Sequence, residues 1–89
     1  MSWKYVGYVI ASKNRKAILS KLEDPTTPTI LAKSINLNLA NVSRTLTELE
    51  NKGLIVCLTP SQRVGRIYSL TKKGKEVLVM IKKMEHTNS

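Results

Sequence analysis

Residues 35–55 read INLNLANVSRTLTELENKGLI, and this stretch decides how the rest of the chain is interpreted. With about 100° between successive residues of a helix, Val42, Leu46 and Leu49 fall together on one side, which predicts a buried face. The opposite side carries short polar side chains and a single arginine, Arg44. Most such faces are simply solvated. The rest of the chain has to show whether this one has a further use.

A second helical segment comes just before this stretch. Thr27 and Pro28 predict the cap and the first residue of a helix that continues through TILAKSI. The turn NLN follows, and its last residue, Asn38, is expected to cap the helix of residues 39–52. Two helices joined by so short a turn predict a helix-turn-helix over residues 28–53.

The pattern changes after Gly53, a residue suited to the left-handed conformation that ends helices. LIVCL and RIYSL are rich in β-branched and apolar residues, and they flank the turn-like stretch TPSQRVG. This predicts a β-hairpin over residues 54–70 with a basic tip at 59–66. Residues 71–86 then combine a threonine cap with one broad apolar face, which predicts a C-terminal helix.

The start of the chain is less clearly patterned. Ser12 precedes KNRKAILSKLE, whose apolar residues have helical spacing, so Ser12 is expected to cap a helix that ends at about Glu23. In residues 1–11 two alternating apolar sets fit about equally well. We interpret this segment as extended, with an irregular helix as the alternative.

The composition restricts the partners of this protein. The 89 residues suit one small domain, residues 1–89, and a net charge of +9 with a pI near 10.0 favours polyanions. Nucleic acid and anionic membranes are the candidates. The longest apolar runs have five residues, whereas a membrane helix needs about 18. No signal-peptide pattern is present, so we expect a cytoplasmic protein without membrane association.

Enzymatic and metal chemistry lack suitable residues. The single cysteine, Cys57, and the single histidine, His86, exclude an internal disulfide and a zinc site. Phosphate-binding glycine loops, nucleophile elbows and paired carboxylates are also missing, so we expect no catalysis and no cofactor. Cys57 could act as a redox switch, but we favour a small, partly buried strand residue because no cation adjoins it in sequence.

Three quoted segments, in one order, resemble a known family. LAKSINLNLANVSRTLTELENKGLI and GRIYSLTKKGKEVL resemble the helix-turn-helix and wing of winged-helix transcription regulators of the MarR and ArsR kinds. VIASKNRKAILSKL resembles the first helix of small archaeal members, so the likeness covers about residues 9–81. The implied fold is α+β, with a three-helix core, a two-stranded wing and a C-terminal helix. The long flanking helices that form the MarR dimer and ligand pocket are lacking, so no small-molecule ligand is expected.

The resemblance implies sequence-specific binding of double-stranded DNA in transcription regulation. Residues 39–52 would be the recognition helix in the major groove, and residues 59–66 would contact the backbone or the minor groove. Arg44 is the one side chain of this helix face able to make a bidentate contact to guanine. The full set of expected DNA-binding residues is Asn38, Ala40, Asn41, Ser43, Arg44, Thr47, Arg63, Arg66, Lys13 and Arg15.

Two other functions remain open at this point. The same fold could dock on a protein of a transcription or replication assembly, or it could bind DNA without sequence preference.

The apolar face of residues 71–86 exceeds what a small core needs, which predicts a homodimer joined through this helix. For the aromatic residues, packing in the core or in the dimer is favoured over stacking on single-stranded bases; these are Trp3, Tyr5, Tyr8 and Tyr68.

Overall fold

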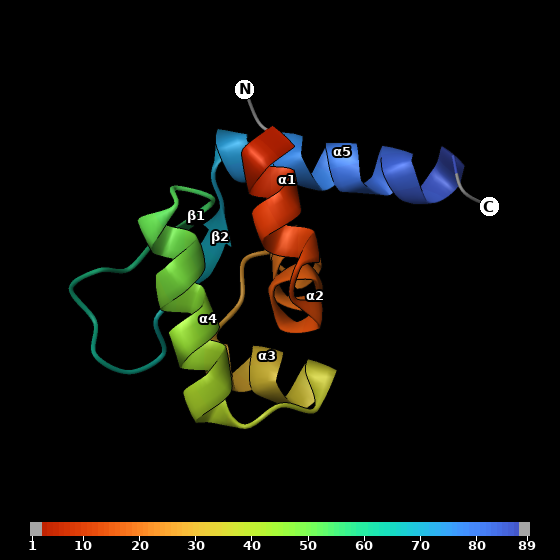
Figure 1. The fold of residues 1–89 in the computed structure, drawn as a ribbon. Coiled ribbons are helices and arrows are strands. Elements are labelled where there is room, and N and C mark those ends of the chain that lie inside the picture. The colour runs from red at the N-terminus through yellow and green to blue at the C-terminus, as the bar shows by residue number, and fades with distance from the viewer. Residues whose placement is uncertain (1–2, 88–89) are drawn as a thin grey trace.

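The computed structural model describes residues 3–87, so residues 1, 2, 88 and 89 of the predicted domain lie outside the described residues. Within the described part, five helices surround one core and a two-stranded sheet extends to one side (Figure 1). This is the predicted α+β architecture, with one helix more than expected. The elements are α1 (Trp3–Ile10), α2 (Lys13–Lys21), α3 (Pro28–Ile35), α4 (Leu39–Asn51), β1 (Ile55–Cys57), β2 (Tyr68–Leu70) and α5 (Lys72–Thr87).

The additional helix is α1, so the prediction of an extended start was wrong. Val6 and Val9, three residues apart, fall on one face of α1 and are 2% and 0% exposed. That face packs against α2 and α5. The alternating pattern of the sequence fits a strand as well as a helix, and the burial of these two valines against distant elements decides between them.

All four predicted helix caps are confirmed, that of Thr71 by the hydrogen bond it accepts from the Gly74 N–H. Ser12, Thr27 and Asn38 each accept a hydrogen bond from the backbone N–H three residues later, at 3.3, 3.3 and 2.8 Å. Asn36, with φ of 56°, ends α3 in the left-handed conformation that asparagine tolerates. Helix α2 ends at Lys21, two residues before the predicted end, which is within the usual uncertainty of helix ends.

The hairpin is confirmed, with shorter strands and a longer loop than the sequence pattern indicated. Strands β1 and β2 pair antiparallel, with Ile55 opposite Leu70 and Cys57 opposite Tyr68. Tyr68 also exchanges two backbone hydrogen bonds with Thr26, at 2.8 and 3.1 Å. The second strand therefore fastens the hairpin to the segment just before α3, and this fixes where the loop between the strands projects.

Helix α5 is joined closely to the end of α4 and the start of β1. The Thr71 hydroxyl accepts a hydrogen bond from the Gly74 N–H at 3.0 Å and donates one to the Gly53 carbonyl at 2.6 Å. A Cβ on Gly74 would lie 1.9 Å from the carbonyl oxygen of Leu54, so only glycine fits this approach. The core that these elements enclose includes Ile18, Leu19, Leu22, Leu31, Val42, Leu46, Leu49, Val77 and Ile81.

Candidate nucleic-acid interface

Helix α4 has the two faces that its sequence predicted. Val42, Leu46 and Leu49 are buried. Ala40, Ser43, Arg44 and Thr47 are exposed, and Asn41 is half-buried. The buried residue that the sequence pattern did not indicate is Thr45, which is 7% exposed. The outward face thus carries short side chains and one long cation.

Arg44 is the free cation of this face. Its side chain is exposed, and no residue in the range 3–87 forms a hydrogen bond or an ion pair with it. Since its guanidinium is not committed within the protein, it remains available to a partner. A planar guanidinium in this state suits bidentate contact with a base edge or a phosphate.

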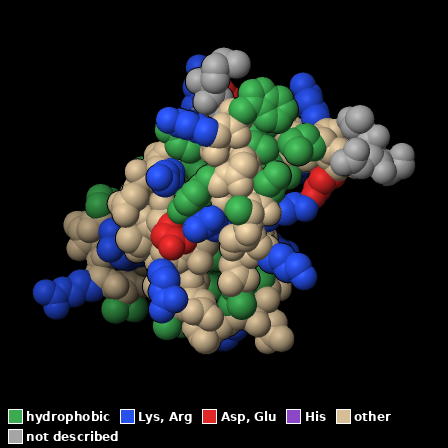
Figure 2. Space-filling model, viewed as in Figure 1, with side chains coloured by type: hydrophobic (Ala, Val, Ile, Leu, Met, Phe, Trp, Pro, Cys, Tyr) green, Lys and Arg blue, Asp and Glu red, His purple; other side chains and the backbone are tan. Residues whose placement is uncertain are grey.

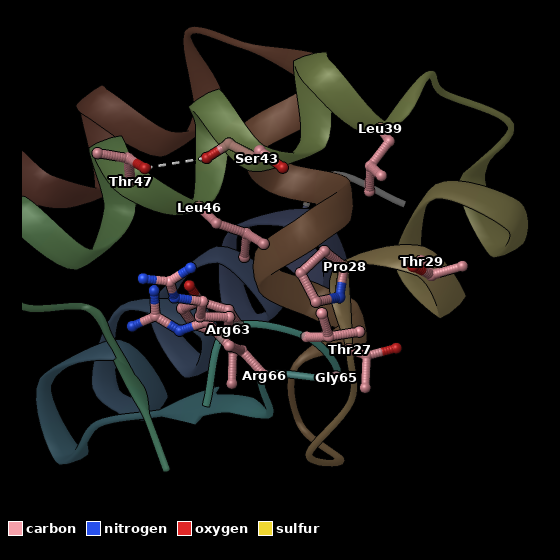
Figure 3. A pocket seen from close by; sticks show the side chains of 12 residues that line it. Thr27, Pro28, Thr29, Leu39, Ser43, Leu46, Thr47, Arg63, Gly65 and Arg66 are labelled. Carbon is pink, nitrogen blue, oxygen red and sulfur yellow. Dashed lines mark hydrogen bonds between the residues drawn. The ribbon is translucent and has the colours of Figure 1, made fainter. Parts of the chain in front are cut away.

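A groove of about 400 Å³ lies between α4 and the loop that joins β1 and β2, and we call it the wing groove. In Figure 3 the α4 side chains Leu39, Ser43 and Thr47 lie on one side of it, and Arg63 and Arg66 of the hairpin loop lie on the other. The start of α3 closes its end. Its lining residues are Thr27, Pro28, Thr29, Leu39, Ser43, Leu46, Thr47, Arg63, Val64, Gly65, Arg66 and Tyr68.

The two arginines of the wing groove have different surroundings. Arg63 is exposed, and no other described side chain is bonded to it. Arg66 is half-buried, donates from Nε to the Cys57 sulfur at 3.3 Å, and lies 5.8 Å from the centre of the Tyr68 ring. Arg66 is therefore partly committed to the hairpin itself, whereas Arg63 is not.

Cys57 is buried, as predicted, and although no cation adjoins it in sequence, the fold brings one next to it. Burial raises the pKa of the Cys57 thiol, and the hydrogen bonds from Arg66 and at Thr59 outweigh that effect, so its pKa is lowered. Arg66 lies nine residues after Cys57, where the hairpin loop returns to β2. Its proximity follows from strand pairing and not from sequence neighbourhood.

Arg15 lies away from the wing groove, in a cluster of tyrosines and cations. Its guanidinium stacks on the Tyr8 ring at 3.9 Å, and Nη1 donates to the Tyr8 carbonyl at 2.9 Å. Its Nε lies 3.5 Å from a carboxylate oxygen of Glu48 on α4. These contacts connect α1, α2 and α4 and direct the guanidinium toward the protein, although its buried Nε has no hydrogen-bond partner among the described residues. Its neighbour Lys13 is exposed at the start of α2.

Three lysines complete this tyrosine cluster, which we define as Tyr5, Tyr8, Arg15, Lys4, Lys52 and Lys73. The Lys4 ammonium lies 5.2 Å from the centre of the Tyr5 ring. The Lys73 ammonium lies 3.9 Å from the centre of the Tyr5 ring, and the Lys52 ammonium lies 5.2 Å from that of Tyr8. Hydrogen bonding to Lys73 is the largest of the effects that lower the pKa of Tyr5. The predicted packing of Tyr68 in the core is confirmed by its 8% exposure, while Tyr5 and Tyr8 cover the edge of the core.

The fold brings some of the expected residues together and separates others. Ser43, Thr47, Arg63 and Arg66 share the wing groove. The other expected residues of α4, which are Ala40, Asn41 and Arg44, do not line the groove. Asn38 caps the helix. Leu39 also lines the groove, at 50% exposure, and was not among the expected residues. The sequence did contain a signal for it, because Leu39 is an apolar residue of this helix that is not part of the predicted buried set Val42, Leu46 and Leu49.

Basic side chains are spread widely over the surface. Figure 2 shows them in blue across the face in view, and one projects at the left edge, on the side where Figure 1 places the loop between β1 and β2. Within residues 3–87 there is no group of three or more metal-ligating side chains. The same range contains no helix long and apolar enough to cross a membrane.

Comparison with known proteins gives one family. The winged helix-turn-helix family model matches residues 15–89. A MarR family transcription regulator has a similar structure, with a TM-score of 0.80 and 24% identity over 93% of this chain and 57% of that one. A MarR family regulator from Neisseria meningitidis gives 0.77 and 25%, over 94% and 61%. No curated protein matches the chain.

One similar structure includes DNA. The transcriptional repressor CouR, bound to a 23-mer DNA duplex, has a TM-score of 0.78 and 30% identity to this chain. The match covers 92% of this chain and 60% of CouR. This chain therefore spans about three fifths of the length of each of these three proteins.

Proposed function

Because the chain belongs to the winged helix-turn-helix family, we propose that it is a sequence-specific, double-stranded DNA-binding transcription regulator acting in the cytoplasm. The observation that carries the proposal is the outward face of α4, where short side chains surround the uncommitted guanidinium of Arg44. Structural likeness to a repressor bound to DNA supports it. So does the net charge of +9.

We propose that α4 enters the major groove with its first two turns. Ala40, Asn41, Ser43 and Thr47 are short enough to let the helix axis approach the base edges closely. Arg44 is the longest side chain among them and would reach the O6 and N7 atoms of a guanine. Asn38 would contribute through its cap, which orients the free N–H groups of the helix start.

The wing would position the protein on the duplex without reading sequence. Arg63 is exposed on the loop beside α4 and would contact a phosphate or the minor groove. Arg66 is held by Cys57 and would act mainly by shaping the loop. Lys13 would add a phosphate contact from α2, whereas the contacts of Arg15 with Tyr8 and Glu48 support a role in holding α1, α2 and α4 together.

We also propose a homodimer on a two-fold symmetric site. Trp3, Ile10 and Val79 are 57%, 45% and 50% exposed, and they belong to α1 and α5. Hydrophobic side chains gather near the top of the molecule in Figure 2, where Figure 1 has these two helices. Exposed apolar surface of this kind favours a partner subunit. Light scattering at micromolar concentration tests it, and a monomer that binds DNA tightly would remove the two-fold site.

Selection of bound duplexes from a random DNA pool tests the proposed function itself. A sequence-specific regulator enriches one motif, and its affinity for that motif exceeds its affinity for scrambled duplexes by about 10³-fold or more. Tight binding without an enriched motif would instead identify a nonspecific architectural protein. If no duplex is retained at low salt, the fold serves protein interaction and the proposal is wrong.

A further inference from the structure

The groove side of α4 carries a stripe of three residues, Leu39, Ser43 and Thr47, at four-residue spacing. Leu39 stands at the first position of the helix, is 50% exposed, and takes no part in the core. Figure 3 shows it at the end of the wing groove nearest α3. A half-exposed leucine is not unusual by itself, but this one lies at the start of α4 and in the lining of the wing groove, within reach of any molecule that enters it.

The hydroxyl group of Thr47 in this stripe is used within the helix. The Thr47 hydroxyl donates to the carbonyl oxygen of Ser43 at 3.0 Å, which is the dashed contact in Figure 3. Its proton is thereby committed to the helix backbone, and its methyl group stays uncommitted. Ala40, about two turns earlier on the same side of α4, is exposed and offers only a methyl group. The outward side of α4 therefore offers apolar groups, at Leu39, Ala40 and the Thr47 methyl, among its polar ones.

The charges around the wing groove indicate which molecule would cover these groups. Arg63 and Arg66 line it, and no carboxylate belongs to its described lining. An anionic partner therefore fits better than a neutral apolar ligand. The major groove of DNA combines phosphates at its edges with one apolar group among the base edges, the C5-methyl of thymine.

We infer that Leu39 is a specificity-determining residue that contacts a thymine methyl group in the bound duplex. This rests on the proposed function and adds to it the class of base that is read. Arg44 would select a guanine, and Leu39, at the preceding turn of the same helix, would select a thymine nearby. The recognition site then contains at least one thymine whose methyl group contributes to affinity.

Replacing thymine by uracil in the selected duplex tests this, because uracil lacks the methyl group and keeps the hydrogen-bonding edge unchanged. Each thymine is replaced in turn, and affinity is measured at one salt concentration. At one position per half-site the wild-type protein should lose about fourfold in affinity, the effect of one buried methyl-sized group. Leu39→Ala should bind both versions of that duplex equally, and Leu39→Met should keep the preference.

Leu58→Ala is the matched control. Leu58 is 52% exposed, carries the same side chain and lies outside the lining of the wing groove. This variant should keep the full thymine preference. Each variant is compared with itself on two duplexes, so a small change in stability does not affect the result.

Three outcomes overturn the inference. No uracil substitution weakens the wild type, or the loss persists unchanged in Leu39→Ala, or Leu58→Ala abolishes it as well. In each of these cases the selected motif still stands, so the proposed function survives. The opposite failure, in which no motif is selected, overturns the proposed function before any uracil duplex is made.

Discussion

In the tyrosine cluster an arginine and three lysines lie against aromatic rings, whereas in the wing groove Arg63 makes no such contact within residues 3–87. Both regions flank α4, and the sequence alone does not distinguish the basic residues of one from those of the other. The cations of the cluster join α1, α2, α4 and α5. Counting positive charges therefore overstates the DNA-binding surface, because part of the charge is already used to hold helices together.

The largest effect is expected at Leu46, which is 2% exposed and lies beneath the wing groove. Leu46→Ala should lower the free energy of unfolding by about 2–5 kcal/mol, because it removes buried side-chain volume from the core. Urea unfolding measures this. A loss below about 1 kcal/mol would mean that the groove floor is not part of the core, and the distinction between the two sides of α4 would fail.

Arg44→Ala comes next and should affect binding alone. On the selected duplex it should cost about 1–3 kcal/mol and relax preference at one position per half-site, with little change on a scrambled duplex. The melting temperature should stay almost unchanged, because Arg44 is exposed and makes no contact that the core needs. Equal losses on both duplexes would assign Arg44 to a phosphate and leave α4 without a guanine reader.

Arg15→Ala should behave in the opposite way. Losing the stacking on Tyr8 and the hydrogen bond to its carbonyl should destabilise the fold by about 1–2 kcal/mol. The ion pair with Glu48 should add little, because it is partly exposed to solvent. The dependence of DNA affinity on salt should match that of the wild type. Lys13→Ala, on the same helix, is the control and should leave the melting temperature unchanged. If Arg15→Ala instead lowers the salt dependence, this arginine contacts a phosphate.

Arg63→Ala should have the smallest and most uniform effect. Removing one phosphate contact should weaken binding to two unrelated duplexes similarly and reduce the slope of log affinity against log salt by about one. Affinity titrations at several salt concentrations provide the slope. A loss confined to the selected motif would show that the wing reads bases, and the wing groove would then be a reading surface on both sides.

Most elements of the fold could be predicted because their signals are local. The caps at Ser12, Thr27 and Asn38 each involve a hydrogen bond to a residue three positions away, so the sequence contains both partners. The buried side of α4 follows from helical spacing in the same way. The outward face with Arg44 is the complement of that pattern. These features needed no knowledge of the rest of the chain.

The remaining features depend on residues distant in sequence, and only the tertiary structure decided them. Val6 and Val9 make α1 a helix because α2 and α5 cover them, and Arg15 turns inward because Tyr8 and Glu48 meet beside it. Likewise, Leu39 lies beside the wing loop only because strand pairing and the bonds between Thr26 and Tyr68 bring that loop next to α4. Side-chain spacing specifies which face of an element is apolar, whereas the element that covers it is selected by packing of the whole chain.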